Sequence, residues 1–237
     1  MDNYDIIVVG AGTAGSVAAW AAARKGVTVL LLELKTPDEI GRKVCGDALG
    51  ARHFDASGVP RPPKEIVLGD VDSIVVYSPS GRHGFKVEGE GYALNRMEWG
   101  RWLVKLAVDA GVDLKHSTKV IQPLLEKGRV VGVKTVHAER GEQNTFHGKI
   151  VIDASGWTGV IRKSLPAGEG IEPMPQPRDL SVCYREVRAL KHPIEHPETA
   201  RIYLDQNIAL GGYWWLFPHG EDQVNIGLGL QGGRGLD

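Results

Sequence analysis

Residues 5–33 read DIIVVGAGTAGSVAAWAAARKGVTVLLLE. The stretch opens with a continuous apolar run (5–10), passes closely spaced glycines, and continues through an alanine-rich segment (14–25) to a second apolar run (27–33). Continuous apolar runs are typical of parallel strands that are buried on both faces. Gly26 follows the alanine-rich segment, where a glycine commonly ends a helix in the left-handed conformation. The stretch therefore predicts a strand–helix–strand unit.

The glycines of this stretch have the spacing Gly-x-Gly-x-x-Gly, with Gly10, Gly12 and Gly15 placed between the first strand and the helix. In such a motif the glycines allow a tight turn, close approach to a diphosphate and close helix–strand packing. The positive end of the helix dipole also attracts the diphosphate. Glu33 ends the second strand, where a carboxylate accepts hydrogen bonds from a ribose 2′-hydroxyl. The motif predicts a dinucleotide site, and Glu33 argues against NADP.

Bulk composition excludes several other classes. The chain has 237 residues, 42% of them apolar, and a formal net charge of −1, so it offers no electrostatic footprint for nucleic acid. Cys45 and Cys183 are too few for a disulfide framework and have no zinc-binding spacing, so we expect no metal site and a reducing, cytoplasmic compartment. Residues 6–23 carry no charge and reach the length of a membrane span, but their glycines favour the strand–turn–helix interpretation.

The rest of the chain predicts a second, β-rich part. A hairpin is expected to turn at residues 78–81, and a second helix to begin at Asn95 with a capping box to Glu98. A segment rich in Pro and Gly (166–177) precedes several short strand-like runs. The predicted fold class is α/β: a Rossmann-like, dinucleotide-binding domain with an interleaved, mostly antiparallel β substrate domain. The predicted boundaries are 1–68 and 95–165 for the first domain, and 69–94 and 166–237 for the second.

The most aromatic part of the chain is GGYWWLFPHG, residues 211–220. Read as a strand, it places Tyr213, Trp215 and Phe217 on one face and Trp214 and Leu216 on the other. The two faces could be ordinary core, an interface, or the wall of an apolar pocket. A second match to the glycine spacing, GLGLQG (227–232), is interpreted differently, because glycines within a strand usually mark close backbone approach.

Three segments in order resemble FAD-dependent oxidoreductases of the para-hydroxybenzoate-hydroxylase-like fold: the glycine loop with Glu33, YALNRMEWGRWL (92–103) and VIDASGWTGVIRKSL (151–165). The resemblance implies FAD as the cofactor. It also implies that Asp153 to Gly156 close over the adenine half of FAD and that Arg96 faces the flavin or its phosphates.

Two further segments, GRKVCGDAL (41–49) and the aromatic stretch at 211–220, resemble the geranylgeranyl reductase family, whose members saturate isoprenoid double bonds. The resemblance implies a catalytic set of Cys45, Asp47, Tyr213 and Trp215, and a substrate pocket of Tyr213, Trp215, Phe217 and Pro218. The implied cofactor-binding set is Gly10, Gly12, Gly15, Glu33, Arg42, Lys43, Cys45, Gly46, Arg96, Asp153 and Gly156.

The same resemblance leaves alternatives open. The chain resembles the N-terminal part of the family, without the later Gly-Asp-Ala-Ala/Ser segment, so a longer enzyme or a C-terminal partner chain from a split gene is expected, with weak FAD retention alone. A flavin monooxygenase or halogenase of the same fold, and a non-catalytic binding subunit, remain as rival interpretations. We expect a prenyl lipid substrate and a peripheral position at the membrane surface. The electron donor is not indicated.

Overall fold

The computed structural model describes residues 3–166, 168, 171 and 175–233. The chain divides into two compact units, Met1–Arg42 with Gly100–Met174, and Lys43–Trp99 with Pro175–Asp237. Each unit is therefore built from two separate segments of the chain, as expected for interleaved domains. Of the linker predicted at 166–177, residues 167, 169–170 and 172–174 lie outside the described residues.

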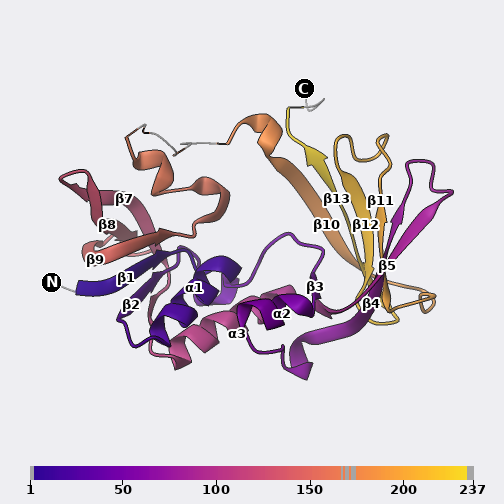
Figure 1. Ribbon diagram of the computed structural model, residues 1–237, viewed down its shortest axis with the longest axis horizontal. Coiled ribbons are helices and arrows are strands. Elements are labelled where there is room, and N and C mark those ends of the chain that lie inside the picture. The colour runs from indigo at the N-terminus through magenta and orange to yellow at the C-terminus, as the bar shows by residue number, and fades with distance from the viewer. Residues whose placement is uncertain (1–2, 167, 169–170, 172–174, 234–237) are drawn as a thin grey trace. The chain divides into compact units, whose positions relative to one another are not determined.

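The first unit contains β1 (Asn3–Val9), α1 (Thr13–Ala23), β2 (Val29–Leu32), β6 (Asp113–Lys115), β7 (Thr118–Glu126), β8 (Arg129–His137) and β9 (Gln143–Asp153). Its six strands have the order β6–β2–β1–β9–β8–β7, and Figure 1 labels all of them except β6. β1 pairs in parallel with both β2 and β9, and β7, β8 and β9 form an antiparallel meander. The predicted strand–helix–strand unit is present as β1–α1–β2. Among the described residues, no helix has the length and apolarity needed to cross a membrane.

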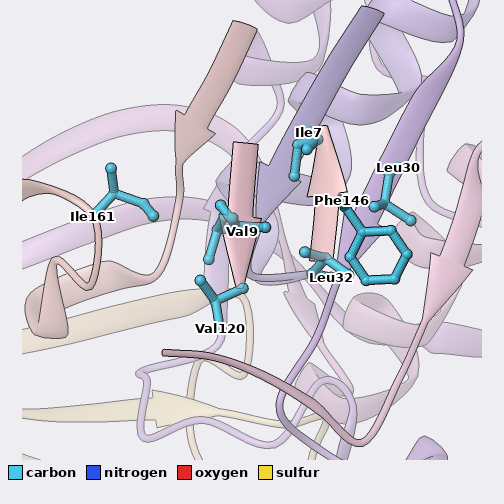
Figure 2. Packing of buried hydrophobic residues seen from close by; sticks show 8 residues of the cluster. Ile7, Val9, Leu30, Leu32, Val120, Phe146 and Ile161 are labelled. Atoms are coloured by element: carbon cyan, nitrogen blue, oxygen red, sulfur yellow. The ribbon is translucent and has the colours of Figure 1, made fainter. Parts of the chain in front are cut away.

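One core cluster of the first unit lies on one face of this sheet. β2 is buried along its whole length, as predicted for a parallel strand with both faces covered. Alternate residues of β1 and β2 meet side chains from the meander and from the segment after β9 (Figure 2). Burial of each such side chain stabilises the fold by roughly 1.5–3 kcal/mol. The cluster consists of Ile7, Val9, Leu30, Leu32, Val120, Val133, Phe146 and Ile161.

The glycine loop packs more closely than any side chain would allow. A Cβ on Gly15 would lie 1.8 Å from the carbonyl oxygen of Gly10, and a Cβ on Gly10 would lie 2.6 Å from the carbonyl oxygen of Ala154. Gly10 also has a φ of 99°, which favours glycine. Helix α1 can therefore begin directly against the end of β1, the role predicted for the third glycine.

The second unit contains β3 (Ala48–Gly50), α2 (Arg52–Ser57), β4 (Val67–Tyr77), β5 (Gly84–Leu94), β10 (Ser181–Ala189), β11 (Thr199–Tyr203), β12 (Tyr213–Pro218) and β13 (Gln223–Gln231). Its seven strands have the order β10–β13–β12–β11–β4–β5–β3 (Figure 1). β11 and β4 are parallel and every other neighbouring pair is antiparallel. This agrees with the predicted α/β fold with a mostly antiparallel second part.

One helix and five short turns complete the described chain. α3 (Arg96–Asp109) begins after Asn95, whose side-chain oxygen accepts the Glu98 N–H at 3.3 Å. The division between the two units falls within α3, after Trp99. The 3₁₀ turns are η1 (Pro37–Glu39), η2 (Lys64–Ile66), η3 (Gly156–Thr158), η4 (Arg162–Ser164) and η5 (Pro177–Asp179).

Residues 43–68, expected with the dinucleotide-binding part, lie in the second unit. The reason is strand pairing: β3 pairs with β5 through Ala48–Ala93, and the Leu94 N–H donates to the Asp47 carbonyl oxygen at 2.8 Å. These backbone bonds attach the segment after Lys43 to the seven-stranded sheet. A three-residue strand has too little pattern for sequence analysis to assign its partner.

The close approach of α1 to β1 is testable by substitution. Gly15→Ala is expected to lower the free energy of unfolding by about 1–3 kcal/mol, because the added methyl overlaps a backbone carbonyl that cannot move independently. Gly89→Ala in β5 is the matched control, since a Cβ there meets no atom within 4 Å. Urea unfolding of both variants measures the difference. Equal stabilities would contradict the packing described.

Candidate functional site

The loop that carries Cys45 packs against the aromatic strand β12. A Cβ on Gly46 would lie 2.6 Å from the ring of Phe217, so only glycine allows the loop to approach this closely. The next residue, Asp47, has a φ of 65°, a left-handed conformation that Asp tolerates better than most residues. Cys45 is half-buried and Asp47 is buried. The two family-like segments of the sequence therefore meet within the second unit.

Three aromatic residues of β12 lie on one face, as the alternation predicted. The rings of Tyr213 and Trp215 are 6.1 Å apart and edge-on, and those of Trp215 and Phe217 are 6.3 Å apart. Trp215 is buried, whereas Tyr213 is 44% exposed. A Cβ on Gly227 would lie 2.3 Å from the Trp215 ring, so this glycine of β13 leaves room for the indole. The result is a row of three aromatic side chains over a glycine-lined strand.

The opposite face of β12 is also aromatic. Trp214 stacks on Tyr203 at 3.8 Å, and Tyr203 stacks on Tyr77 at 4.6 Å, with nearly parallel rings in both pairs. Trp214 and Leu216 are half-buried. The doubled tryptophan therefore belongs to two separate aromatic rows, one on each side of the sheet.

Asn225 connects the loop to the aromatic row. Its side chain is fully buried in β13. The Trp215 indole N–H donates to Asn225 Oδ1 at 2.9 Å. In turn, Asn225 Nδ2 donates to Asp47 Oδ2 at 2.8 Å and to the Cys45 carbonyl oxygen at 2.9 Å. One amide thus connects Trp215 to the loop of Cys45 and Asp47, which lies far from it in the sequence.

The groups around Asp47 counteract the effect of burial on its pKa. Arg185 Nη1 lies 3.4 Å and His219 Nε2 lies 3.9 Å from Asp47 Oδ2, and Asp47 and His219 side chains are 2% and 3% exposed. Burial raises the pKa of Asp47, while Arg185, Asn225, Arg96 and Cys45 act in the opposite direction. Burial, followed by repulsion from Arg185, lowers the pKa of His219 to about 4. His219 is therefore neutral at pH 7, and Asp47 keeps its proton to a higher pH than an exposed aspartate.

The N-terminus of α1 fits the diphosphate of a dinucleotide. Gly12 precedes the helix, and a Cβ there would meet no protein atom within 4 Å. No side chain caps this end of α1, and its first turn holds no acidic residue. The positive end of the helix dipole is therefore not neutralised by the helix's own residues, which suits an anion.

Glu33 completes this end of the site. Its Oε2 accepts the Ala11 N–H at 2.6 Å and its Oε1 accepts the Lys35 N–H at 2.9 Å. Each carboxylate oxygen keeps a further lone pair for a ribose hydroxyl. Together with the open position at Gly12, this acceptor carboxylate fits the adenosine diphosphate half of FAD.

Asp153 shapes the turn after β9 with its own carboxylate. Oδ1 accepts from the backbone and hydroxyl of Ser155, and Oδ2 accepts the N–H groups of Ile161 and Arg162. Burial acts to raise the pKa of Asp153, but these hydrogen bonds together lower it. The carboxylate is therefore fully engaged within the turn, and Gly156, with a φ of 73°, allows the chain to reverse.

The predicted site residues fall into two groups. The first unit holds Gly10, Gly12, Gly15, Glu33, Arg42, Asp153 and Gly156, and the second holds Lys43, Cys45, Gly46, Asp47, Arg96, Tyr213, Trp215, Phe217 and Pro218. Arg42 and Lys43 are exposed.

Sequence reasoning missed Arg185, His219 and Asn225. The one available signal was a lone Asn within the apolar, glycine-rich run QVNIGLGL (223–230).

Burial of neutral His219 makes stability depend on pH. The unfolded chain binds a proton at the ordinary histidine pKa of 6.5, whereas the folded chain binds it only near pH 4. Stability is therefore full above about pH 6.5 and falls as the pH drops toward 4, by up to about 3 kcal/mol. His219→Gln is expected to remove most of this loss, measured by urea unfolding across the pH range. His83→Gln, at an exposed position, should keep it. Identical pH profiles for the two variants would refute the assignment.

The chain matches two family models. Residues 5–167 match the model described as glucose inhibited division protein A, and residues 179–237 match the geranylgeranyl reductase catalytic domain. Digeranylgeranylglycerophospholipid reductase of Sulfolobus acidocaldarius is 38% identical over 98% of this chain and 52% of its own length. Digeranylgeranylglycerophospholipid reductase 1 of Methanopyrus kandleri is 38% identical over 97% of this chain and 58% of its own. The chain thus spans about half the length of these curated relatives.

Two solved structures have a similar fold. A geranylgeranyl bacteriochlorophyll reductase-like protein from Thermoplasma acidophilum superimposes with a TM-score of 0.85 and 28% identity, covering 98% of this chain and 57% of the other. A myxobacterial chondrochloren halogenase, described as FAD-dependent, has a TM-score of 0.79 at 19% identity, covers 98% and 53% of the two chains, and shares the fold alone. The chain thus belongs to the family of the glucose inhibited division protein A model over residues 5–167, its residues 179–237 match the geranylgeranyl reductase catalytic domain, and as a whole it is similar to digeranylgeranylglycerophospholipid reductases.

Proposed function

We propose that the protein is part of a flavin-dependent reductase that saturates C=C bonds in the geranylgeranyl groups of membrane-lipid precursors or related prenyl chains. The observation that carries the proposal is the junction between the Cys45 loop and the aromatic face of β12, made by Asn225. Relatives named digeranylgeranylglycerophospholipid reductase support the substrate class.

FAD is the cofactor that this proposal requires. Gly10, Gly12, Gly15 and Glu33 would hold its adenosine diphosphate half, through the α1 N-terminus and the carboxylate. Bound FAD in its reduced form supplies a hydride, and the protein's part is to bind, orient and exclude water. The flavin-binding role that the family resemblance implies for Lys43, Cys45, Gly46 and Arg96 stays a separate prediction.

A prenyl chain suits the aromatic face because it offers almost nothing to hydrogen-bond. Recognition must then come from apolar walls of defined shape. Tyr213, Trp215 and Phe217 supply such a wall, and Pro218 ends it, buried at the end of β12. The one polar atom of the Trp215 ring is already bonded to Asn225, so the ring presents an apolar surface.

Asp47 is the candidate proton donor. Alkene reduction needs one hydride and one proton, and burial raises the pKa of this carboxyl group. In the proposed step the O–H bond of Asp47 breaks, a C–H bond forms at the second alkene carbon, and a carboxylate remains. Arg185, 3.4 Å away, then stabilises that carboxylate. Cys45 precedes this group in the same loop and would face the reacting groups with it.

We also propose where the protein acts and what completes it. A cytoplasmic protein that acts on a prenyl lipid would approach the membrane surface from outside the bilayer. A C-terminal remainder, on the same chain or on a partner chain, would complete the enzyme.

The direct test is anaerobic turnover. We expect dithionite-reduced, FAD-loaded holoenzyme to add two hydrogens to each reduced double bond of a geranylgeranyl lipid, measured by mass spectrometry. The rate should fall as pH rises through the pKa of Asp47, because only the protonated acid donates. Absence of any such mass gain would refute the reductase proposal.

The same assay separates the rival functions. A monooxygenase or halogenase would require oxygen and would yield hydroxylated or halogenated products, with no hydrogen added under anaerobic conditions. A non-catalytic binding subunit would bind flavin or lipid without turnover, even when supplied with the C-terminal half of a relative.

A further inference from the structure

The orientation of the Asn225 amide is determined by its neighbours. An indole N–H can only donate, so the atom of Asn225 that faces Trp215 must be the carbonyl oxygen Oδ1. The NH₂ group must then point the other way, where both of its hydrogens find acceptors on Asp47 and Cys45. The amide is fully buried, and a flipped amide would put donor against donor at Trp215.

This orientation makes the two oxygens of Asp47 unequal. Oδ2 accepts from Asn225, whereas Oδ1 is buried and makes no hydrogen bond with the described residues. In a carboxylic acid the carbonyl oxygen is the acceptor and the hydroxyl oxygen is the donor. Donation by Asn225 to Oδ2 therefore favours the acid proton on Oδ1.

The charged and titratable groups that face Asp47 come from several elements. Arg185 lies on β10, His219 follows β12, Arg96 begins α3, and Cys45 lies in the same loop. Arg185 and His219 approach on the Oδ2 side, at 3.4 and 3.9 Å. The side-chain contacts that Asn225, Arg185 and His219 make with Asp47 thus all lie at Oδ2, and Oδ1 is the carboxyl oxygen without a hydrogen-bond partner among the described residues.

We propose that Asn225 is a positioning residue: its amide reserves Oδ1 of Asp47 for the transferable proton and holds the Cys45 loop against Trp215. The inference rests on the proposed reductase function, in which Asp47 donates that proton to the alkene. Asn225 itself touches neither substrate nor cofactor in this role.

The variant Asn225→Asp tests the role of the amide. At neutral pH its carboxyl group shares a proton with Asp47 Oδ2 in place of donating to it, which moves the proton away from Oδ1. We expect kcat to fall by up to about a hundredfold. Activity relative to wild type should recover as the pH is lowered and both carboxyl groups are protonated. Asn225→Leu should lose activity at every pH, and Asn207→Asp, at an exposed loop position, should follow wild type.

A second measurement does not depend on turnover. The ¹⁵N–¹H signal of the Trp215 indole is expected to shift more with pH in Asn225→Asp, where its direct hydrogen-bond partner titrates, than in wild type, where that partner is a neutral amide. A double-mutant cycle of Trp215→Phe with Asn225→Leu, read by urea unfolding, should show coupling between the two positions.

The outcomes distinguish the two proposals. The first outcome is a pH-dependent indole signal in Asn225→Asp and coupling in the double-mutant cycle, while wild type never reduces the alkene. This outcome would support the amide orientation. It would overturn the reductase proposal and, with it, the positioning role that rests on that proposal. If wild type is active and Asn225→Leu has the same kcat and pH profile, the positioning role alone is overturned. A loss in Asn225→Asp that does not recover at low pH would also overturn it.

Discussion

The buried amide of Asn225 must accept one hydrogen bond and donate two in a space that water does not reach. A polar group left unpaired in such a place costs about 1–3 kcal/mol, so the three partners constrain one another. Trp215 cannot rotate away without leaving an oxygen unpaired, and the loop at Cys45 cannot withdraw without leaving the NH₂ group unpaired. The positions of the loop and of the aromatic row thus depend on one side chain.

The same junction explains how two opposite pKa shifts arise side by side. Asp47 and His219 are both almost completely buried, and burial disfavours whichever form is charged. Asp47 therefore tends to keep its proton and His219 tends to lose its own. Arg185 remains as the permanent charge of the cluster, close enough to balance a carboxylate when one forms. Such an arrangement can alternate between a neutral acid and a compensated anion.

Sequence reasoning was most successful where a motif is local. The β1–α1–β2 unit, the turn between β4 and β5, and the start of α3 follow from glycine spacing, turn residues and capping within a few positions. The alternation in β12 also placed Tyr213, Trp215 and Phe217 on one face correctly. Sequence reasoning was less informative about the unit to which residues 43–68 belong, because β3 pairs with β5, which lies at distant positions of the chain.

The sequence by itself determined that this chain begins with a dinucleotide-type glycine loop, because Gly10, Gly12 and Gly15 act through short-range backbone geometry. It also determined, through two family-like segments, which loop and which strand carry the candidate site. Only the tertiary structure decided that Asn225, Arg185 and His219 join them. Those residues lie more than a hundred positions from Asp47, and the pairing of β10, β12 and β13 brings them together. Hydrogen bonding and burial act between neighbours in space, and that neighbourhood exists only after the sheet has formed.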